Sequence, residues 1–134
     1  METRLLTIAA VCEGLAGLAL ILFPGYAIAL LLDAEPHGPA LMIARVAGVA
    51  LLSLGVACAG AAMDVATAAR RWTVVAITLY NAGAGVLLVA FAADRMAGGV
   101  VIWIAGVFHL VLASTFGACF ADVHRHTESG WRNA

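Results

Sequence analysis

The sequence contains no lysine, and charged residues of both signs make up only 11% of its 134 positions. A soluble domain of average composition carries roughly 25% charged residues. The net charge is −1, so the chain lacks the basic surface with which proteins bind nucleic acid. It also lacks a glycine-rich phosphate-binding loop. These absences exclude a nucleic-acid-binding protein and a nucleotide-binding domain.

Cysteine is scarce, and its placement excludes two further classes. The three cysteines all fall inside apolar stretches and show no CxxC spacing: Cys12, Cys58 and Cys119. An odd number of buried cysteines argues against a disulfide framework and against a zinc site. We therefore expect free thiols that pack as small hydrophobic side chains, and no metal.

Apolar residues are abundant: 64% of the chain is hydrophobic and the mean hydropathy is +1.04. A chain this small cannot hide so much apolar surface in its own core. Because a helix needs about 20 apolar residues to cross a bilayer, the sequence predicts a single all-α integral membrane domain, a four-transmembrane-helix bundle over residues 1–134. The predicted spans are residues 4–23, 40–62, 72–93 and 99–121, followed by a cytoplasmic tail at 122–134.

The arginines predict the orientation of the spans. Five lie on one side of the predicted membrane, and only Arg95 lies on the other: Arg4, Arg70, Arg71, Arg125 and Arg132. The positive-inside tendency then places both termini in the cytoplasm. On the outer side, "AIALLLD" after Pro24–Gly25 is either a short interfacial helix or an extension of the first span. Asp33, Glu35 and His37 follow it and fit a solvated acidic loop better than a metal site.

Each predicted span carries one conspicuous polar residue: Glu13, Arg45, Asn81 and His109. A charged side chain at the bilayer centre costs about 2.5–3.5 kcal/mol, so such residues usually face the bundle interior. Glycine or alanine lies three or four positions from each of them, as on surfaces where membrane helices pack closely. Counted from the ends of the spans, Glu13, Asn81 and His109 all lie near mid-depth. We therefore predict a ligand-binding cluster in which Glu13 pairs with Arg45, and Asn81 and His109 lie within hydrogen-bonding reach. The predicted surrounding residues are Tyr80, Thr78, Ser53 and Ser114.

Two alternatives accompany this cluster. Arg45 enters from the outer side, and its long side chain can reach either the headgroups or the midplane. The four polar residues can also serve only to join the helices, because interhelical hydrogen bonds contribute about 0.6 kcal/mol each. If the predicted cluster forms, the cations Arg45 and His109 would oppose a cationic ligand at Glu13.

A faint internal repeat links the two halves. Aligning "CEGLAGLALILF" (12–23) with "YNAGAGVLLVAF" (80–91) matches Glu13 with Asn81 and Gly17 with Gly85. "VAGV" (46–49) matches "IAGV" (104–107), although at a different offset. The interpretation is two helical hairpins in the same orientation, related by an axis along the membrane normal. Chance similarity between helices rich in small residues is the alternative.

At "RLLTIAAVCEGLAGLALILFP", "ARVAGVALLSLG", "YNAGAG" and "WIAGVFH" the chain resembles small four-span bacterial membrane proteins grouped as DoxX-like. The resemblance covers most of the chain and implies a bacterial inner membrane. Some members are associated with thiosulfate–quinone redox systems. The resemblance assigns no catalytic residue.

Three functions fit the sequence. The first is binding or transport of a small ligand or protons at the buried polar cluster, without catalysis. The second is a membrane-embedded redox protein acting on a quinone, or holding haem through His109, which would need a dimer for bis-histidine ligation. The third is an accessory subunit of a larger membrane complex. We favour the first and predict no cofactor; besides lipid and a small molecule, the expected partner is a second copy or a larger complex.

Overall fold

The computed structural model describes residues 2–65, 67–95 and 99–132, and all the regular structure in this part of the chain is helical. It forms five helices: α1 (Glu2–Leu22), α2 (Pro24–Leu32), α3 (Pro39–Met63), α4 (Ala68–Arg95) and α5 (Val100–Arg132). Four of them, all except α2, are long and apolar enough to cross a membrane. The predicted all-α fold with four long apolar helices is therefore confirmed. The helix α5 also continues beyond the predicted span, through most of the predicted tail.

The segment after the first span forms a separate short helix rather than an extension. Phe23 leaves the helical conformation, and Pro24 begins α2 at a position where its missing N–H costs nothing. The helix α2 ends at Leu32, and its C-cap residue Asp33 adopts the left-handed conformation and donates its backbone N–H to the Ala29 carbonyl at 2.9 Å. Gly38, also at positive φ, turns the chain into Pro39 at the start of α3.

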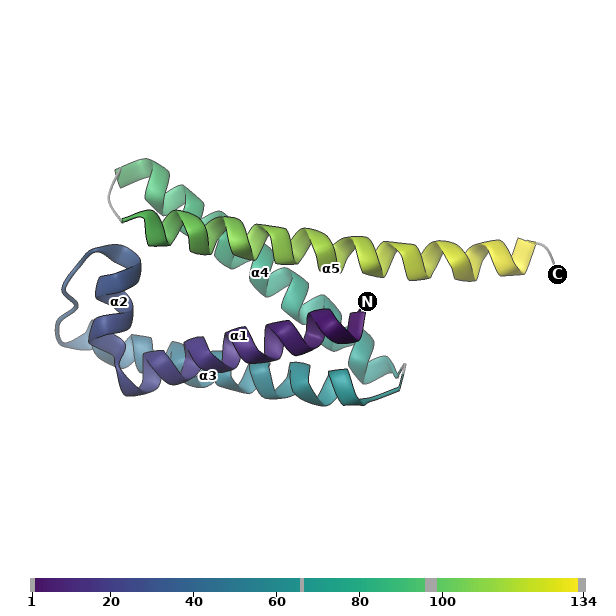
Figure 1. The fold of residues 1–134 in the computed structure, drawn as a ribbon, viewed down its shortest axis with the longest axis horizontal. Helices are drawn as coiled ribbons and strands as arrows, with labels where there is room; N and C mark the ends of the chain where they lie inside the picture. The colour runs from purple at the N-terminus through teal and green to yellow at the C-terminus, as the bar shows by residue number, and fades with distance from the viewer. Residues whose placement is uncertain (1, 66, 96–98, 133–134) are drawn as a thin grey trace.

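The long helices associate as two antiparallel pairs: the first pair is α1 with α3, and the second pair is α4 with α5 (Figure 1). In the first pair, a Cβ added at Gly17 would lie 2.7 Å from the Gly48 carbonyl oxygen, so only glycine permits this approach. In the second pair, a Cβ at Gly85 would lie 2.7 Å from the Leu110 side chain and 3.1 Å from the Gly106 carbonyl oxygen. Small residues thus set the helix spacing in both pairs.

The two pairs meet at one end of the bundle, here called the closed end. Its hydrophobic core combines the beginnings of α1 and α4 with the later parts of α3 and α5: Leu6, Ala9, Cys58, Ala61, Val74, Ile77 and Phe116. Arg70 ties the same end together. Its Nε lies 2.9 Å from Glu2 Oε1, its Nη1 donates to the Asp64 carbonyl at 2.8 Å, and its Nη2 donates to Thr3 Oγ1 at 2.9 Å.

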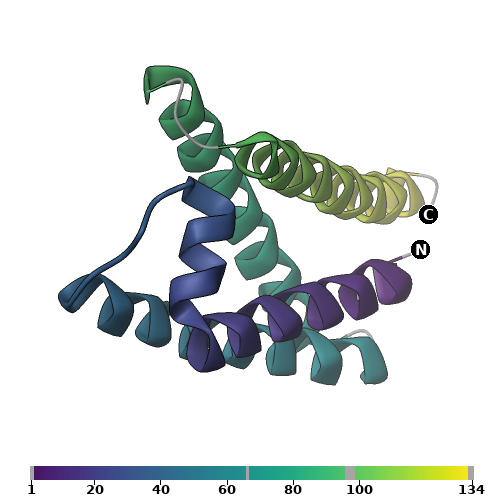
Figure 2. The ribbon, with the colours of Figure 1, turned by 60° about the vertical axis from the view of Figure 1, so that its left-hand side comes forward.

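Toward the other end, the pocket end, the two pairs diverge, and α2 stands between them (Figure 2). The helix α2 contacts α1, α3 and α5, so it bridges the first pair to the second. The outward surfaces of the long helices carry exposed leucine, isoleucine and valine side chains, as contact with lipid requires. The bundle is therefore packed at its closed end and hollow at its pocket end.

Candidate functional site

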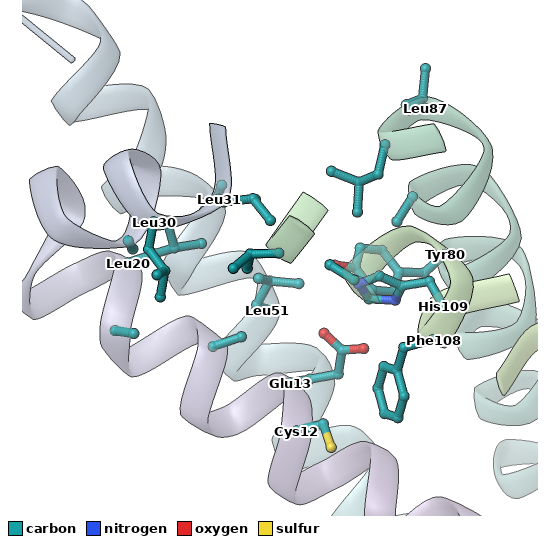
Figure 3. Close-up of a pocket in the computed structure, with 18 of the residues that line it drawn as sticks. Cys12, Glu13, Leu20, Leu30, Leu31, Leu51, Tyr80, Leu87, Phe108 and His109 are labelled. Carbon is teal, nitrogen blue, oxygen red and sulfur yellow. The ribbon is translucent and has the colours of Figure 1, made fainter. Parts of the chain in front are cut away.

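A cavity of about 720 Å³ lies between the two helix pairs. Its walls come from all five helices of the described part of the chain, and about two thirds of the lining residues are alanine or leucine. Leu30 and Leu31 of α2 line it, together with Leu20, Leu51 and Leu87 (Figure 3). The polar lining residues, Glu13, Tyr80 and His109, gather on the side of the cavity that is next to the core of the closed end. The cavity therefore has one polar end and an otherwise apolar wall.

Glu13 lies one turn after the core residue Ala9 on α1 and is only 2% exposed. Its carboxyl group points toward Tyr80 and His109 (Figure 3). Tyr80 is the side chain that interacts with this carboxyl group, but the buried Oε1 atom has no hydrogen-bond partner. Within the described residues, Oε1 is the buried side-chain oxygen or nitrogen that stays unpaired. An unsatisfied buried polar atom costs about 1–3 kcal/mol, and more when the group is charged.

Asn81 and His109 form a second polar unit, in which a hydrogen bond joins α4 to α5. Asn81 is fully buried and donates Nδ2–H to the Ile77 carbonyl at 2.8 Å. Its Oδ1 lies 2.7 Å from His109 Nδ1. Because Oδ1 carries no hydrogen, this bond requires Nδ1 to be the donor, which makes Nε2 the acceptor nitrogen of the neutral ring. The rings of Tyr80 and His109 pack in a T-shaped arrangement, with ring centroids 5.7 Å apart.

The predicted ion pair between Glu13 and Arg45 is wrong. Arg45 is exposed on α3 and forms no ion pair within the described residues. The register of the first pair explains the separation, because Gly14 on α1 meets Gly55 on α3. Arg45 precedes Gly55 by ten residues, so it lies roughly 15 Å along the helix from the level of Glu13. Its side chain is exposed on the surface of α3 instead of entering the space beside Glu13.

Of the four predicted surrounding residues, the cavity includes only Tyr80 in its lining. The other three hydroxyls donate to carbonyls of their own helices: Thr78 to Val74, Ser53 to Val49 and Ser114 to Leu110, at 2.7–2.8 Å. These intrahelical bonds satisfy a hydroxyl within an apolar span without a partner from another helix. The side chains of Ser53 and Ser114 are also exposed on the outer surface.

Sequence reasoning missed the cavity and its apolar lining. Cys12, Phe108 and the alanines at positions 16, 50 and 84 all face it. The signal in the sequence was the row of small residues next to Glu13 and Asn81, which was interpreted as helix contact rather than as space. In the described residues, no three histidine, cysteine or acidic side chains gather as a metal site.

Comparison of the chain with known protein families, curated proteins and solved structures gives no match.

Proposed function

We propose that this protein binds a small ligand or protons in the cavity between its two helix pairs, and transports them. The observation that carries the proposal is the Glu13 carboxyl group, which is buried at the polar end of a 720 Å³ cavity with Oε1 unpaired. If the polar residues served only to join helices, the Glu13 oxygens would be paired across the helices, as Asn81 Oδ1 and His109 Nδ1 are. A carboxyl group beside an empty volume is instead available to a ligand.

The faint repeat supports a site shared by two halves. Adding 68 to the buried positions of α1 (6, 9, 13 and 17) gives 74, 77, 81 and 85, which are all buried in α4. Adding 58 to those of α3 (44, 48, 55, 58 and 61) gives 102, 106, 113, 116 and 119, which are all buried in α5. We therefore propose that the two pairs are copies of one hairpin, related by an axis along the membrane normal.

Under the same relation the two walls of the cavity correspond. Cys12, Ala16 and Leu20 on α1 match Tyr80, Ala84 and Leu88 on α4, and all six line the cavity. On α3 and α5, Ala47, Ala50 and Leu51 match Ala105, Phe108 and His109, which also line it. Glu13 corresponds to Asn81, so the proposed duplication has produced a carboxylate on one side of the cavity and an amide–imidazole pair on the other.

The orientation follows from the arginines. We propose that both termini and the closed end, with Arg70, face the cytoplasm of a bacterial cell, and that α2 lies at the outer face of the inner membrane. The resemblance to DoxX-like proteins supports this membrane. The polar end of the cavity then lies near mid-depth, and the apolar walls lead from it toward α2.

Native mass spectrometry of the protein released from lipid nanodiscs tests the proposal. We expect wild type and the matched control Glu35→Gln, in the exposed outer loop, to carry the same bound small molecule. Glu13→Gln should lose that molecule because it removes the charge while keeping the shape. Ala50→Phe should lose it because the added ring fills the cavity. Equal retention by all four proteins would contradict a site at Glu13.

A proton as the substrate has its own measurement. In proteoliposomes with an internal pH dye, an imposed proton gradient should relax faster with wild type than with Glu13→Gln. Wild type and Glu13→Gln must first give the same helical circular dichroism and the same melting temperature. If the gradients relax at equal rates and no small molecule is retained, the proposed function fails.

A further inference from the structure

The polar end of the cavity offers hydrogen-bond acceptors to whatever enters it. The bond from His109 Nδ1 to Asn81 leaves Nε2 as an acceptor nitrogen. Glu13 contributes a carboxyl group with an unpaired oxygen. The Tyr80 hydroxyl, which interacts with the same carboxyl group, both donates and accepts. A ligand that fits this end must therefore bring donors.

The charges around the cavity point in the same direction. The seven cations of the sequence are arginines, and none of the four whose side chains the structure describes lines the cavity. Arg45 is exposed about 15 Å along the helix from the level of Glu13, and Arg70 is held by Glu2, Asp64 and Thr3 at the closed end. The other titratable side chains near Glu13 are Cys12, Cys58, Tyr80 and His109, of which only His109 can become a cation. An ionised Glu13 in this apolar volume therefore lacks the countercharge that a buried carboxylate requires.

The geometry points to a lipophilic amine in its protonated form as the ligand of this cavity, with its ammonium group between Glu13 and His109. This inference rests on the proposed function and names the class of its ligand. The ammonium N–H groups donate to the Glu13 carboxylate and to His109 Nε2, and the positive charge supplies the missing countercharge. The hydrocarbon part lies against the alanine and leucine walls that lead toward α2. The expectation that Arg45 and His109 oppose a cation is reversed, because Arg45 is remote and His109 presents an acceptor.

Three probes with the same skeleton separate the contributions of charge and of N–H donors. Phenylbutylamine is a protonated amine at neutral pH, phenylbutanol is uncharged, and phenylbutyltrimethylammonium is a cation without N–H groups. Their binding to the protein in lipid nanodiscs can be measured by titration calorimetry, with empty nanodiscs subtracted. We expect the amine to bind at least about tenfold more tightly than either of the other probes, because charge and N–H donors both contribute.

Variants locate the binding. Glu13→Gln should reduce the affinity for the amine to that for the alcohol, whereas the control Glu35→Gln should leave it unchanged. Ala50→Phe should weaken the binding of all three probes, because it reduces the volume of the cavity.

Each contrary result has a distinct meaning. If the alcohol binds as tightly as the amine and both are lost in Ala50→Phe, the cavity binds ligands but the inferred class is wrong. If the trimethylammonium probe binds as tightly as the amine, the requirement for N–H donors is wrong. If Glu13→Gln retains full affinity for the amine, the inferred role of Glu13 is wrong. If wild type binds none of the probes and retains no native molecule, both this inference and the proposed function fail.

Discussion

The closed end and the pocket end of this bundle are made of the same four long helices, yet they differ in packing and in the pairing of their polar groups. At the closed end, apolar side chains from all four helices fill the space between the pairs, and the Arg70 guanidinium group has a partner on each of its nitrogens. At the pocket end the pairs diverge, alanines replace larger side chains, and the Glu13 carboxyl group keeps an unpaired oxygen. The closed end is thus tightly packed and its polar groups are paired, whereas the pocket end holds the cavity and the unpaired carboxyl oxygen.

This difference implies that one end of the bundle stabilises the fold and the other end binds the ligand. Filled cores and paired charges stabilise a fold, whereas voids and unpaired polar atoms destabilise it. In this protein the void and the unpaired polar atom lie at the same end, and in the proposed function ligand binding offsets their cost. The closed end then holds the two pairs together while the pocket end admits the ligand.

The largest expected effect comes from two phenylalanines of α5. Phe116 is fully buried in the core of the closed end, whereas Phe108 is 42% exposed and lines the cavity. Phe116→Ala should lower the free energy of unfolding by about 3–5 kcal/mol through the lost burial and the void. Phe108→Ala should cost less than about 1 kcal/mol, since its ring has fewer contacts to lose. Unfolding in mixed micelles measures both values. Equal losses of unfolding free energy would contradict the proposed difference in packing between the two ends.

The next effect tests how closely the two helices of each pair are held together. A Cβ at Gly17 meets backbone atoms of Gly48 and Leu52 at 2.7 Å, and backbone cannot move aside without parting the helices. A Cβ at Gly85 meets mainly the flexible side chain of Leu110. Gly17→Ala should therefore cost about 1–3 kcal/mol of unfolding free energy, and Gly85→Ala clearly less. The same unfolding assay decides, and a larger loss for Gly85→Ala would show that the second pair is the more tightly fixed.

A smaller effect is expected from the polar contacts of the closed end. Arg70→Ala removes three bonds that join α1, the α3–α4 connection and α4, and it should cost about 1–2 kcal/mol. Arg71→Ala provides a matched control, because that side chain is exposed and its loss should cost no more than about 0.5 kcal/mol. Melting temperatures at low and high salt give both values. Equal effects of the two substitutions would show that the Arg70 contacts add nothing.

The smallest effect on stability, with a specific spectroscopic signature, is expected from Asn81→Leu. Loss of the bond to His109 should cost about 0.6 kcal/mol. In wild type, the imidazole ¹⁵N resonances should show hydrogen on Nδ1, and in the variant both tautomers should appear. If the wild-type ring carries hydrogen on Nε2, the acceptor assigned to the polar end of the cavity is wrong.

The sequence alone predicted the helical fold well, for a physical reason. Inside a bilayer each backbone group must be paired within its own segment, so long apolar runs leave few choices other than helices. The inward placement of Glu13, Asn81 and His109 also followed from the sequence, because small residues mark the packed face of each helix. The Asn81–His109 contact was within that reasoning, since both residues were expected near mid-depth on packing faces.

The same reasoning could not predict the position of Arg45 or the presence of the cavity. The depth of Arg45 relative to Glu13 depends on the register of α1 against α3, which the contacts of Gly14 and Gly17 determine in three dimensions. Proximity of Arg45 to Gly48 in sequence suggested a shared packing face, but three positions also rotate a side chain by about 60° around the helix. The cavity depends on the divergence of the pairs and on the place where α2 packs between them, and neither is determined by local sequence.

The most direct test of the central claim is photolabelling of the native chain in nanodiscs with an uncharged alkyl diazirine, followed by peptide mapping. If the space between the pairs admits a ligand, label should appear on the inward positions 16, 50 and 84 as well as on outward lipid-facing positions such as 46 and 49, and Ala50→Phe should remove only the inward label. Label confined to the outward positions would contradict the account, because it would mean that nothing enters the space beside Glu13.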